Sequence, residues 1–269
     1  MELFQKIGKE ASEVAKRMYG TAEAREKLER GAGGDITVKI DKVVEDIIID
    51  HLKKRGNVKL ISEEAGEVVF GEPEAVILAD PIDGSFNAKN GIPLFAISLA
   101  LAIPEQGSID SAKVADAKLG YVKLPVSGLE YWAVRDGGAF KNGRRFHTEK
   151  DDRLNMFAVE LSPNTIESFK RFSKLLDGNS RLRCIGSLAL DLCYTADSIF
   201  DCVLDLRKGR CRIIDTLAGI LIVEEAGGVI SDDKGNSIDH IPLNVERAFN
   251  LVGARNEKIH KKIIDALVE

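Results

Sequence analysis

Apolar residues recur every three or four positions in two segments of the first 55 residues. In the first segment these residues are Leu3, Phe4, Ile7, Ala11, Val14, Ala15 and Met18. Their spacing predicts a helix over residues 2–28, ended by the glycine-rich run at residues 31–34. In the second segment they are Ile40, Val43, Val44, Ile47, Ile48 and Leu52. This stripe predicts a helix over residues 40–54, and the acidic residues Asp41, Glu45, Asp46 and Asp50 lie largely off it.

Shorter apolar runs after residue 55 are typical of strands. The runs at residues 58–61 and 75–79 predict two strands, and the second is wholly apolar, which indicates burial on both faces. Further runs lie at about residues 94–103, 113–122 and 129–135, with turn signals at residues 137–138 and 142–143. They predict an antiparallel sheet joined by tight turns.

From about residue 150 the pattern alternates between strand and helix. We expect strands at 156–160, 182–185, 200–204 and 250–252, and helices at 165–176, 187–196, 215–226 and 257–267. This order is typical of an α/β unit. We therefore expect an α+β subdomain over residues 1–150 and an α/β subdomain over residues 151–269, packed together as one unit.

Composition and charge narrow the class of protein. The chain has 269 residues, of which 44% are hydrophobic and 30% charged, and its net charge is −5. A mildly acidic chain is a poor general nucleic-acid binder. The longest apolar run, residues 94–103, is shorter than the roughly 20 residues of a membrane span, and the amino terminus lacks a secretory pattern. We expect a cytoplasmic protein with no membrane or nucleic-acid partner. The low number of glutamines, two in the chain, is typical of thermophilic proteins.

The four cysteines follow a regular spacing that matches no zinc motif. Cys184, Cys193, Cys202 and Cys211 lie nine residues apart, without a C-x-x-C pair. We expect them to be small buried side chains. A disulfide between two of them is an alternative that the sequence leaves open.

The most informative local feature is the loop Asp80-Pro81-Ile82-Asp83-Gly84-Ser85. It follows the wholly apolar strand and carries two carboxylates three residues apart. Pro81 restricts the backbone, and Gly84 allows a ligand to approach closely. Carboxylate oxygens suit Mg²⁺ or Mn²⁺, and the free N–H groups of a helical turn that starts at Gly84 and Ser85 can hold a phosphate. An ordinary aspartate turn at a strand end is the alternative.

Two further acidic residues could reach the same place. Glu63 follows the strand at 58–61, so it points toward the same edge as Asp80 if the two strands are neighbours. Asp215 opens the apolar helix at 215–226. Their alternatives are a solvated acidic loop and a helix N-cap, respectively.

Taken together, the segments ISEEAG, ILADPIDGSFNAKNGIP, LRCIGSLALDLCYTADS and RIIDTLAGILIVEEAGG resemble, in order and spacing, the inositol monophosphatase family of Mg²⁺-dependent phosphatases. The resemblance covers about residues 35–255. The GSFNAKNGIP stretch, and an arginine eight residues before Asp215, are most similar to the archaeal branch, which hydrolyses fructose 1,6-bisphosphate and inositol 1-phosphate. The resemblance implies a layered α/β/α/β/α sugar-phosphatase fold and a homodimer. The first subdomain would carry the metal and phosphate loop, and the second would complete the active site.

The resemblance also implies roles for individual residues. The implied ligands of two or three Mg²⁺ ions, for which Mn²⁺ can substitute, are Glu63, Asp80, the carbonyl of Ile82, Asp83 and Asp215. Asp83, Gly84 and Ser85 would hold the phosphate. Asp41 and the hydroxyl of Ser85 would orient the attacking water, and Glu63 is the third implied catalytic residue. Ser85 stands where threonine is usual in the family.

Substrate choice rests on the basic segment Arg207-Lys208-Gly209-Arg210-Cys211-Arg212. Four cations so close to Asp215 could seat a second phosphate, although a solvent-exposed basic turn is the alternative. The archaeal branch implies that Arg183 and Arg207 contact the substrate and that Leu188 lines the pocket. We therefore expect a phosphomonoesterase for small phosphate esters, acting on fructose 1,6-bisphosphate and inositol 1-phosphate. The alternatives are a 3′-phosphoadenosine 5′-phosphate phosphatase and a non-catalytic, metal-binding regulatory protein.

Overall fold

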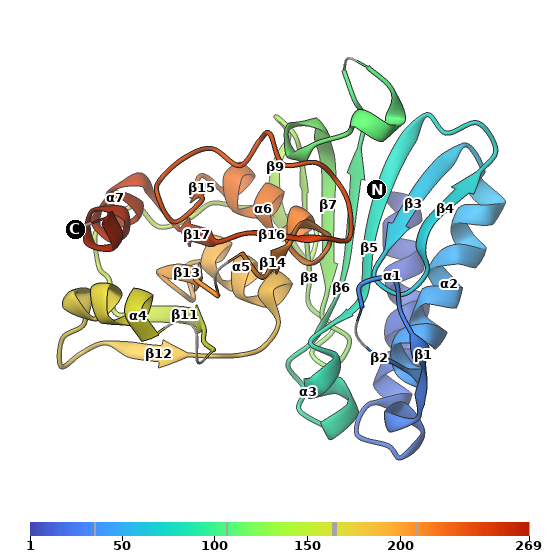
Figure 1. The fold of residues 1–269 in the computed structure, drawn as a ribbon, viewed down its shortest axis with the longest axis horizontal. Helices are drawn as coiled ribbons and strands as arrows, with labels where there is room; N and C mark the ends of the chain where they lie inside the picture. Colours follow the sequence, from blue (N-terminus) through green and yellow to red (C-terminus); the bar gives the residue numbers. More distant parts are fainter. Residues whose placement is uncertain (35, 106, 163–165, 208, 269) are drawn as a thin grey trace.

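Helices and sheets alternate in layers through the chain (Figure 1). A computed structural model describes residues 1–34, 36–105, 107–162, 166–207 and 209–268. Its helices are α1 (Glu2–Met18), α2 (Lys39–Arg55), α3 (Ser85–Asn90), α4 (Ile166–Phe172), α5 (Leu188–Ala196), α6 (Ile213–Ala226) and α7 (Glu257–Val268).

Within these described ranges the strands form two large sheets and two short two-stranded sheets. The first half of the chain contains β1 (Lys27–Arg30), β2 (Ile36–Val38), β3 (Val58–Ser62), β4 (Gly66–Phe70), β5 (Ala75–Asp83), β6 (Ala96–Ala102), β7 (Ala117–Lys123), β8 (Glu130–Val134), β9 (Gly138–Lys141) and β10 (Arg144–Phe146). The second half contains β11 (Met156–Glu160), β12 (Arg181–Arg183), β13 (Cys202–Asp205), β14 (Cys211–Arg212), β15 (Val229–Ser231), β16 (Arg247–Phe249) and β17 (Leu251–Ala254).

The layers follow from which apolar faces meet. Helices α1 and α2 cover one face of an eight-stranded sheet with the order β10-β9-β8-β7-β6-β5-β3-β4. Helices α5 and α6 lie between its other face and a five-stranded sheet with the order β12-β11-β13-β17-β15. Helices α4 and α7 cover the outer face of that second sheet. This arrangement confirms the predicted layered α/β/α/β/α fold.

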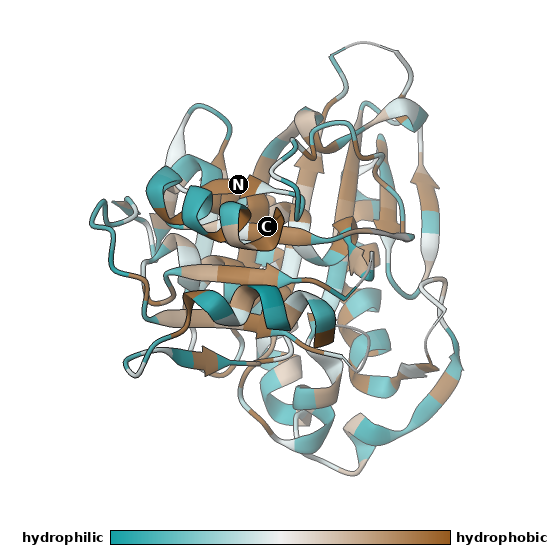
Figure 2. Cartoon of the chain, turned by 60° about the vertical axis from the view of Figure 1, so that its left-hand side comes forward, coloured by the Kyte–Doolittle hydropathy of each residue, from teal (hydrophilic) through white to brown (hydrophobic). Residues whose placement is uncertain are grey.

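Strand β5 shows how the sequence produces these layers. It is buried along its whole length, as predicted for the apolar run at residues 75–79. Successive side chains of a strand point to opposite faces, so Val76 and Leu78 join the core around α5 and α6, whereas Ile77 and Ala79 join the core under α1 and α2. Figure 2 shows the same partition, with apolar strands inside and polar residues on the outer turns of the covering helices.

Several predicted boundaries need correction. The helix predicted over residues 2–28 is wrong in its second half, because α1 ends at Met18 and β1 begins at Lys27. Gly20 has a φ of 75°, and the charged segment that follows has no apolar stripe to pack against the sheet. The first sheet is antiparallel as predicted, except that β3 and β5 run parallel. The short strands β1, β2, β4, β9, β10, β14, β15 and β16 were not predicted.

The two large sheets fall on either side of residue 150, since β10 ends at Phe146 and β11 begins at Met156. Helix α6 nevertheless packs tightly on the first sheet. A Cβ atom at Gly120 of β7 would lie 2.5 Å from the carbonyl oxygen of Ala218 in α6. The division into subdomains at residue 150 stays a prediction.

The structure also bears on the predicted state of the cysteines and on the predicted absence of a membrane span. Cys193, Cys202 and Cys211 are buried as predicted, Cys184 is exposed, and all four are free thiols. The disulfide alternative therefore has no support in the structure. Over the described ranges, none of the helices has both the length and the apolar character needed to cross a membrane.

Candidate active site

Three carboxylates from distant parts of the chain converge. Glu63, Asp80 and Asp215 each offer an oxygen, and these oxygens all lie within 4.8 Å of one another. Strands β3 and β5 are parallel neighbours, with Ser62 opposite Ala79. The residues that come next, Glu63 and Asp80, therefore meet at the same edge of the sheet. Helix α6 brings Asp215 to this edge in its first turn.

The electrostatics of this group fit a divalent cation. Asp80 is only 2% exposed, and burial raises the pKa of Asp80 and of Asp215 well above the usual range, with the neighbouring carboxylates adding to the effect. The Oδ1 atom of Asp215 is buried without a hydrogen-bond partner among the described residues. Desolvated, mutually repelling oxygen donors are the set that Mg²⁺ and Mn²⁺ prefer. The residues present therefore fit the metal that the sequence predicts.

Asp83 lies in the same loop but has other partners. Its Oδ2 atom accepts hydrogen bonds from the Ser187 hydroxyl at 2.7 Å and from the Ala189 amide at 2.6 Å. It thereby satisfies an amide at the start of α5. Burial raises the pKa of Asp83 to about 7, against the effect of these two bonds. Among the described residues, the converging group holds three of the four predicted carboxylate ligands, and Asp83 lies against α5.

The predicted pair of Asp41 and Ser85 is in direct contact. The Ser85 hydroxyl lies 2.9 Å from Oδ1 of Asp41 and 2.9 Å from the carbonyl oxygen of Ile82. Its single proton can serve only one of these acceptors at a time. Asp41 is 3% exposed, and burial raises its pKa to about 8, with the Ser85 bond acting in the opposite direction. Burial of Asp41 therefore favours a proton on this hydrogen-bonded pair.

Gly84 explains why this loop can fold so tightly. Its φ is 96°, a left-handed conformation in which most residues are strained. A Cβ atom there would also lie 3.1 Å from the carbonyl oxygen of Gly186 and 3.2 Å from that of Leu94. Gly84 is the N-cap of α3, so Ser85 opens this short helix as the sequence predicts.

The basic segment does not act as one patch. Arg207 directs its guanidinium at Asp205, with Nε–Oδ1 and Nη2–Oδ2 distances of 2.8 and 2.7 Å, and its Nη1 lies 3.5 Å from Glu160. Arg212 contacts Glu63 and donates to the carbonyl of Gly33 at 2.9 Å. Arg210 is exposed, and Lys208 lies outside the described residues.

The other two predicted substrate contacts are placed differently. Arg183 is exposed on β12, and its guanidinium donates to the carbonyl of Leu182 at 2.9 Å. Leu188 is buried in the apolar core between the two sheets. Arg183 therefore lies on the surface and Leu188 in the core, and their predicted roles in substrate binding stay predictions.

Sequence reasoning missed the acidic partners of Arg207. Glu160 and Asp205 end the parallel neighbours β11 and β13, where they lie directly opposite each other. Both are buried. The signal was present, because each carboxylate follows an apolar strand in the way that Asp80 does. Recognising these two carboxylates as neighbours would have required knowing that β11 and β13 are paired.

Known proteins resemble this chain over nearly its whole length, in sequence and in structure. The model of the inositol monophosphatase family matches residues 2–269. The chain is 34% identical to the fructose-1,6-bisphosphatase/inositol-1-monophosphatase of Archaeoglobus fulgidus, over 97% of each chain. It is 29% identical to the bifunctional NADP phosphatase/NAD kinase of Methanococcus maripaludis, over 98% of this chain and 48% of that protein. It superposes on a crystal structure of an inositol monophosphatase–fructose 1,6-bisphosphatase with a TM-score of 0.83, at 27% identity and over 98% of each chain. The chain therefore belongs to the inositol monophosphatase family.

Proposed function

We propose that the chain is a Mg²⁺-dependent phosphomonoesterase that hydrolyses fructose 1,6-bisphosphate and inositol 1-phosphate. The observation that supports this most directly is the convergence of Glu63, Asp80 and Asp215 within 4.8 Å. The Ser85 hydroxyl, five residues after Asp80, is hydrogen-bonded to Asp41 of α2. Membership of the family, and relatives named for both substrates, support the same activity.

The metal would be held by the three converging carboxylates. Asp83 and the carbonyl of Ile82 stay predicted further ligands, as does binding of two or three Mg²⁺ ions, with Mn²⁺ as a substitute. When bound, divalent ions supply positive charge that offsets the charge of the phosphate and of the departing oxygen. Burial raises the pKa of Asp80 and of Asp215, which favours their protonated forms. Because a metal ligand must be deprotonated, we expect metal binding to release protons from these carboxyl groups.

The remaining chemistry falls to Asp41 and Ser85. When the Ser85 proton points at Asp41, the lone pairs of the hydroxyl oxygen are free to accept a hydrogen bond from water. That water forms the new bond to phosphorus and gives up a proton toward Ser85 and Asp41, while the ester bond breaks and the alcohol oxygen leaves and takes up a proton. Such a reaction needs no covalent phosphoenzyme. Gly84 and Ser85 would hold the phosphate through their amides, as the sequence predicts.

Substrate choice turns on Arg207. Its guanidinium is shared by the carboxylates of Asp205 and Glu160, so a second phosphate would have to compete with two buried anions. A phosphatase of this family named for NADP also matches the chain. The homodimer and the cytoplasmic location expected from the sequence stay predictions.

The deciding experiment is a substrate panel with the purified chain. Phosphate release would be measured from fructose 1,6-bisphosphate, inositol 1-phosphate, NADP and 3′-phosphoadenosine 5′-phosphate, with Mg²⁺, with Mn²⁺ and with a chelator. We expect Mg²⁺-dependent hydrolysis of the first two. Preference for NADP or for the adenosine bisphosphate would replace the proposed substrates. Metal binding without hydrolysis of any ester would favour the regulatory alternative.

A further inference from the structure

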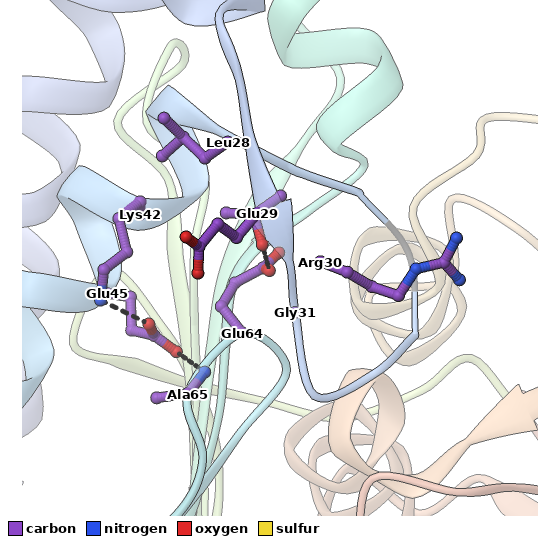
Figure 3. Close-up of a pocket in the computed structure, with 9 residues that line it drawn as sticks. Leu28, Glu29, Arg30, Gly31, Lys42, Glu45, Glu64 and Ala65 are labelled. Carbon is purple, nitrogen blue, oxygen red and sulfur yellow. Dashed lines mark hydrogen bonds and ion pairs between the residues drawn. The ribbon is translucent and has the colours of Figure 1, made fainter.

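Glu45 is a fully buried carboxylate one helical turn after Asp41. It lies in α2 and is 0% exposed. Oε1 accepts hydrogen bonds from the Ser62 hydroxyl and from the Ala65 amide, the latter at 2.8 Å. Oε2 pairs with Lys42 at 3.2 Å. Figure 3 shows the side chain reaching from α2 between Lys42 and Ala65.

The two donors on Oε1 flank the turn that carries a predicted metal ligand. Ser62 ends β3, Ala65 precedes β4, and Glu63 lies between them. One carboxylate oxygen therefore fixes both ends of this turn to α2. Residues four apart lie on the same face of a helix, so Asp41 and Glu45 project toward the same side of α2.

A second set of contacts holds the turn from the opposite direction. The Gly33 amide donates to the carbonyl of Glu63 at 2.7 Å, and the Ala32 amide donates to that of Glu64 at 2.9 Å. These bonds come from the glycine-rich loop, which has no regular structure of its own. The regular element that contacts this turn is therefore helix α2, through the carboxylate of Glu45.

Burying a carboxylate is costly unless its oxygens are paired. Here both oxygens have partners, and two of the three donors belong to one turn. We propose that Glu45 is a positioning residue that sets Glu63 relative to Asp41, and so tunes metal affinity. The proposal rests on the proposed function in that Glu63 is taken as a metal ligand.

Conservative variants test this role. Glu45→Gln keeps an acceptor oxygen but loses the charge, and Ser62→Ala removes one donor while keeping Glu45. We expect both to weaken Mg²⁺ binding, measured by calorimetry, by about 10- to 100-fold, as is typical when a residue that orients a metal ligand is changed. Amide hydrogen exchange at Ala65 should accelerate in Glu45→Gln, and the Mg²⁺ concentration for half-maximal activity should rise more than kcat falls.

Two controls separate positioning from general stability. Asp201→Asn changes another buried carboxylate, which accepts from the amides of Asn155 and Met156 at the start of β11 and pairs with Arg255. Lys42→Met removes the solvent-side partner of Glu45, together with an ion pair between Lys42 and Asp46 on the same helix. At a matched loss of thermal stability, both should retain wild-type Mg²⁺ affinity.

The outcomes distinguish the two proposals. Unchanged Mg²⁺ affinity in Glu45→Gln and Ser62→Ala, or an equal loss in Asp201→Asn, would overturn the positioning role. A wild-type chain that binds Mg²⁺ but hydrolyses no ester contradicts the proposed function alone, and the affinity comparison still decides the role of Glu45. A wild-type chain that binds no Mg²⁺ overturns both.

Discussion

The hydroxyl of Ser85 and the carboxylate of Asp41, 44 residues apart in the sequence, lie 2.9 Å apart in the structure. The first opens α3 and the second lies in the first turn of α2, so their contact depends on the packing of two helices. Because Asp41 is almost fully buried, this contact is shielded from solvent. It is the pair that we propose orients the attacking water.

Loss of either partner should lower turnover. We expect Asp41→Asn and Ser85→Ala to reduce kcat by about 10²- to 10⁴-fold at saturating Mg²⁺, because this is the usual contribution of a positioned proton acceptor. Ser85→Thr keeps the hydroxyl and restricts its rotamers, so it should retain activity. Steady-state kinetics on fructose 1,6-bisphosphate checks this. Wild-type kcat in Asp41→Asn would remove the pair from the mechanism.

Asp83 should combine a structural and an electrostatic role. Asp83→Asn keeps an acceptor for Ser187 and Ala189 but loses the charge, so the variant should fold. We expect kcat to fall by at least about 10²- to 10³-fold, in the range seen when one central electrostatic group is lost. Thermal melting checks that the variant folds, and steady-state kinetics on the same sample checks the fall in kcat. A folded, fully active variant would show that Asp83 serves only α5.

Arg207 should discriminate between the two proposed substrates, because only fructose 1,6-bisphosphate has a second phosphate. If Arg207 turns from Asp205 to bind it, Arg207→Ala loses a charge-assisted contact of about 1.5–3 kcal/mol. That corresponds to about 10- to 150-fold in kcat/KM, with a much smaller loss for inositol 1-phosphate. Both substrates would be compared at one Mg²⁺ concentration. Equal losses would mean that Arg207 serves mainly to neutralise Asp205 and Glu160.

Asp191 should make stability depend on pH. Its carboxylate is 0% exposed, and neither oxygen has a hydrogen-bond partner among the described residues. Burial raises its pKa well above 3.8, and the charges of Glu160, Asp83 and Asp205 add to the effect. The folded state therefore binds this proton more tightly than the unfolded state, and the free energy of unfolding falls as pH rises above the ordinary aspartate range.

Asp191→Asn cannot ionise, so it should lose less stability than the wild type as the pH rises above the ordinary aspartate pKa. Urea unfolding at several pH values measures the difference. Glu72→Gln, at an exposed position, is the control and should follow the wild type. Parallel curves for Asp191→Asn and the wild type would show that Asp191 ionises in the folded protein at nearly the ordinary aspartate pKa, and would contradict the prediction.

The sequence by itself determined the features that depend on local pattern. The apolar stripe of α2, the all-apolar β5 and the glycine that starts α3 are each readable because a helix or strand buries one face or both. Four segments taken together, including the one around Asp80 and Asp83, were also sufficient to identify the family and the layered fold. The end of α1 was predicted wrongly, because the helix was extended to the glycine-rich run at residues 31–34 although its apolar stripe stops at Met18.

Only the tertiary structure decided which partner each charged group meets. Glu63 reaches Arg212, 149 residues away, and Asp83 reaches α5, 106 residues away. Arg207, expected to be free for substrate, is paired with Asp205, and Glu45, expected off the buried face, is fully buried. Periodicity reports whether a face is buried, whereas strand pairing and helix packing determine what lies against it. A buried charge must find its partner in that second, three-dimensional arrangement.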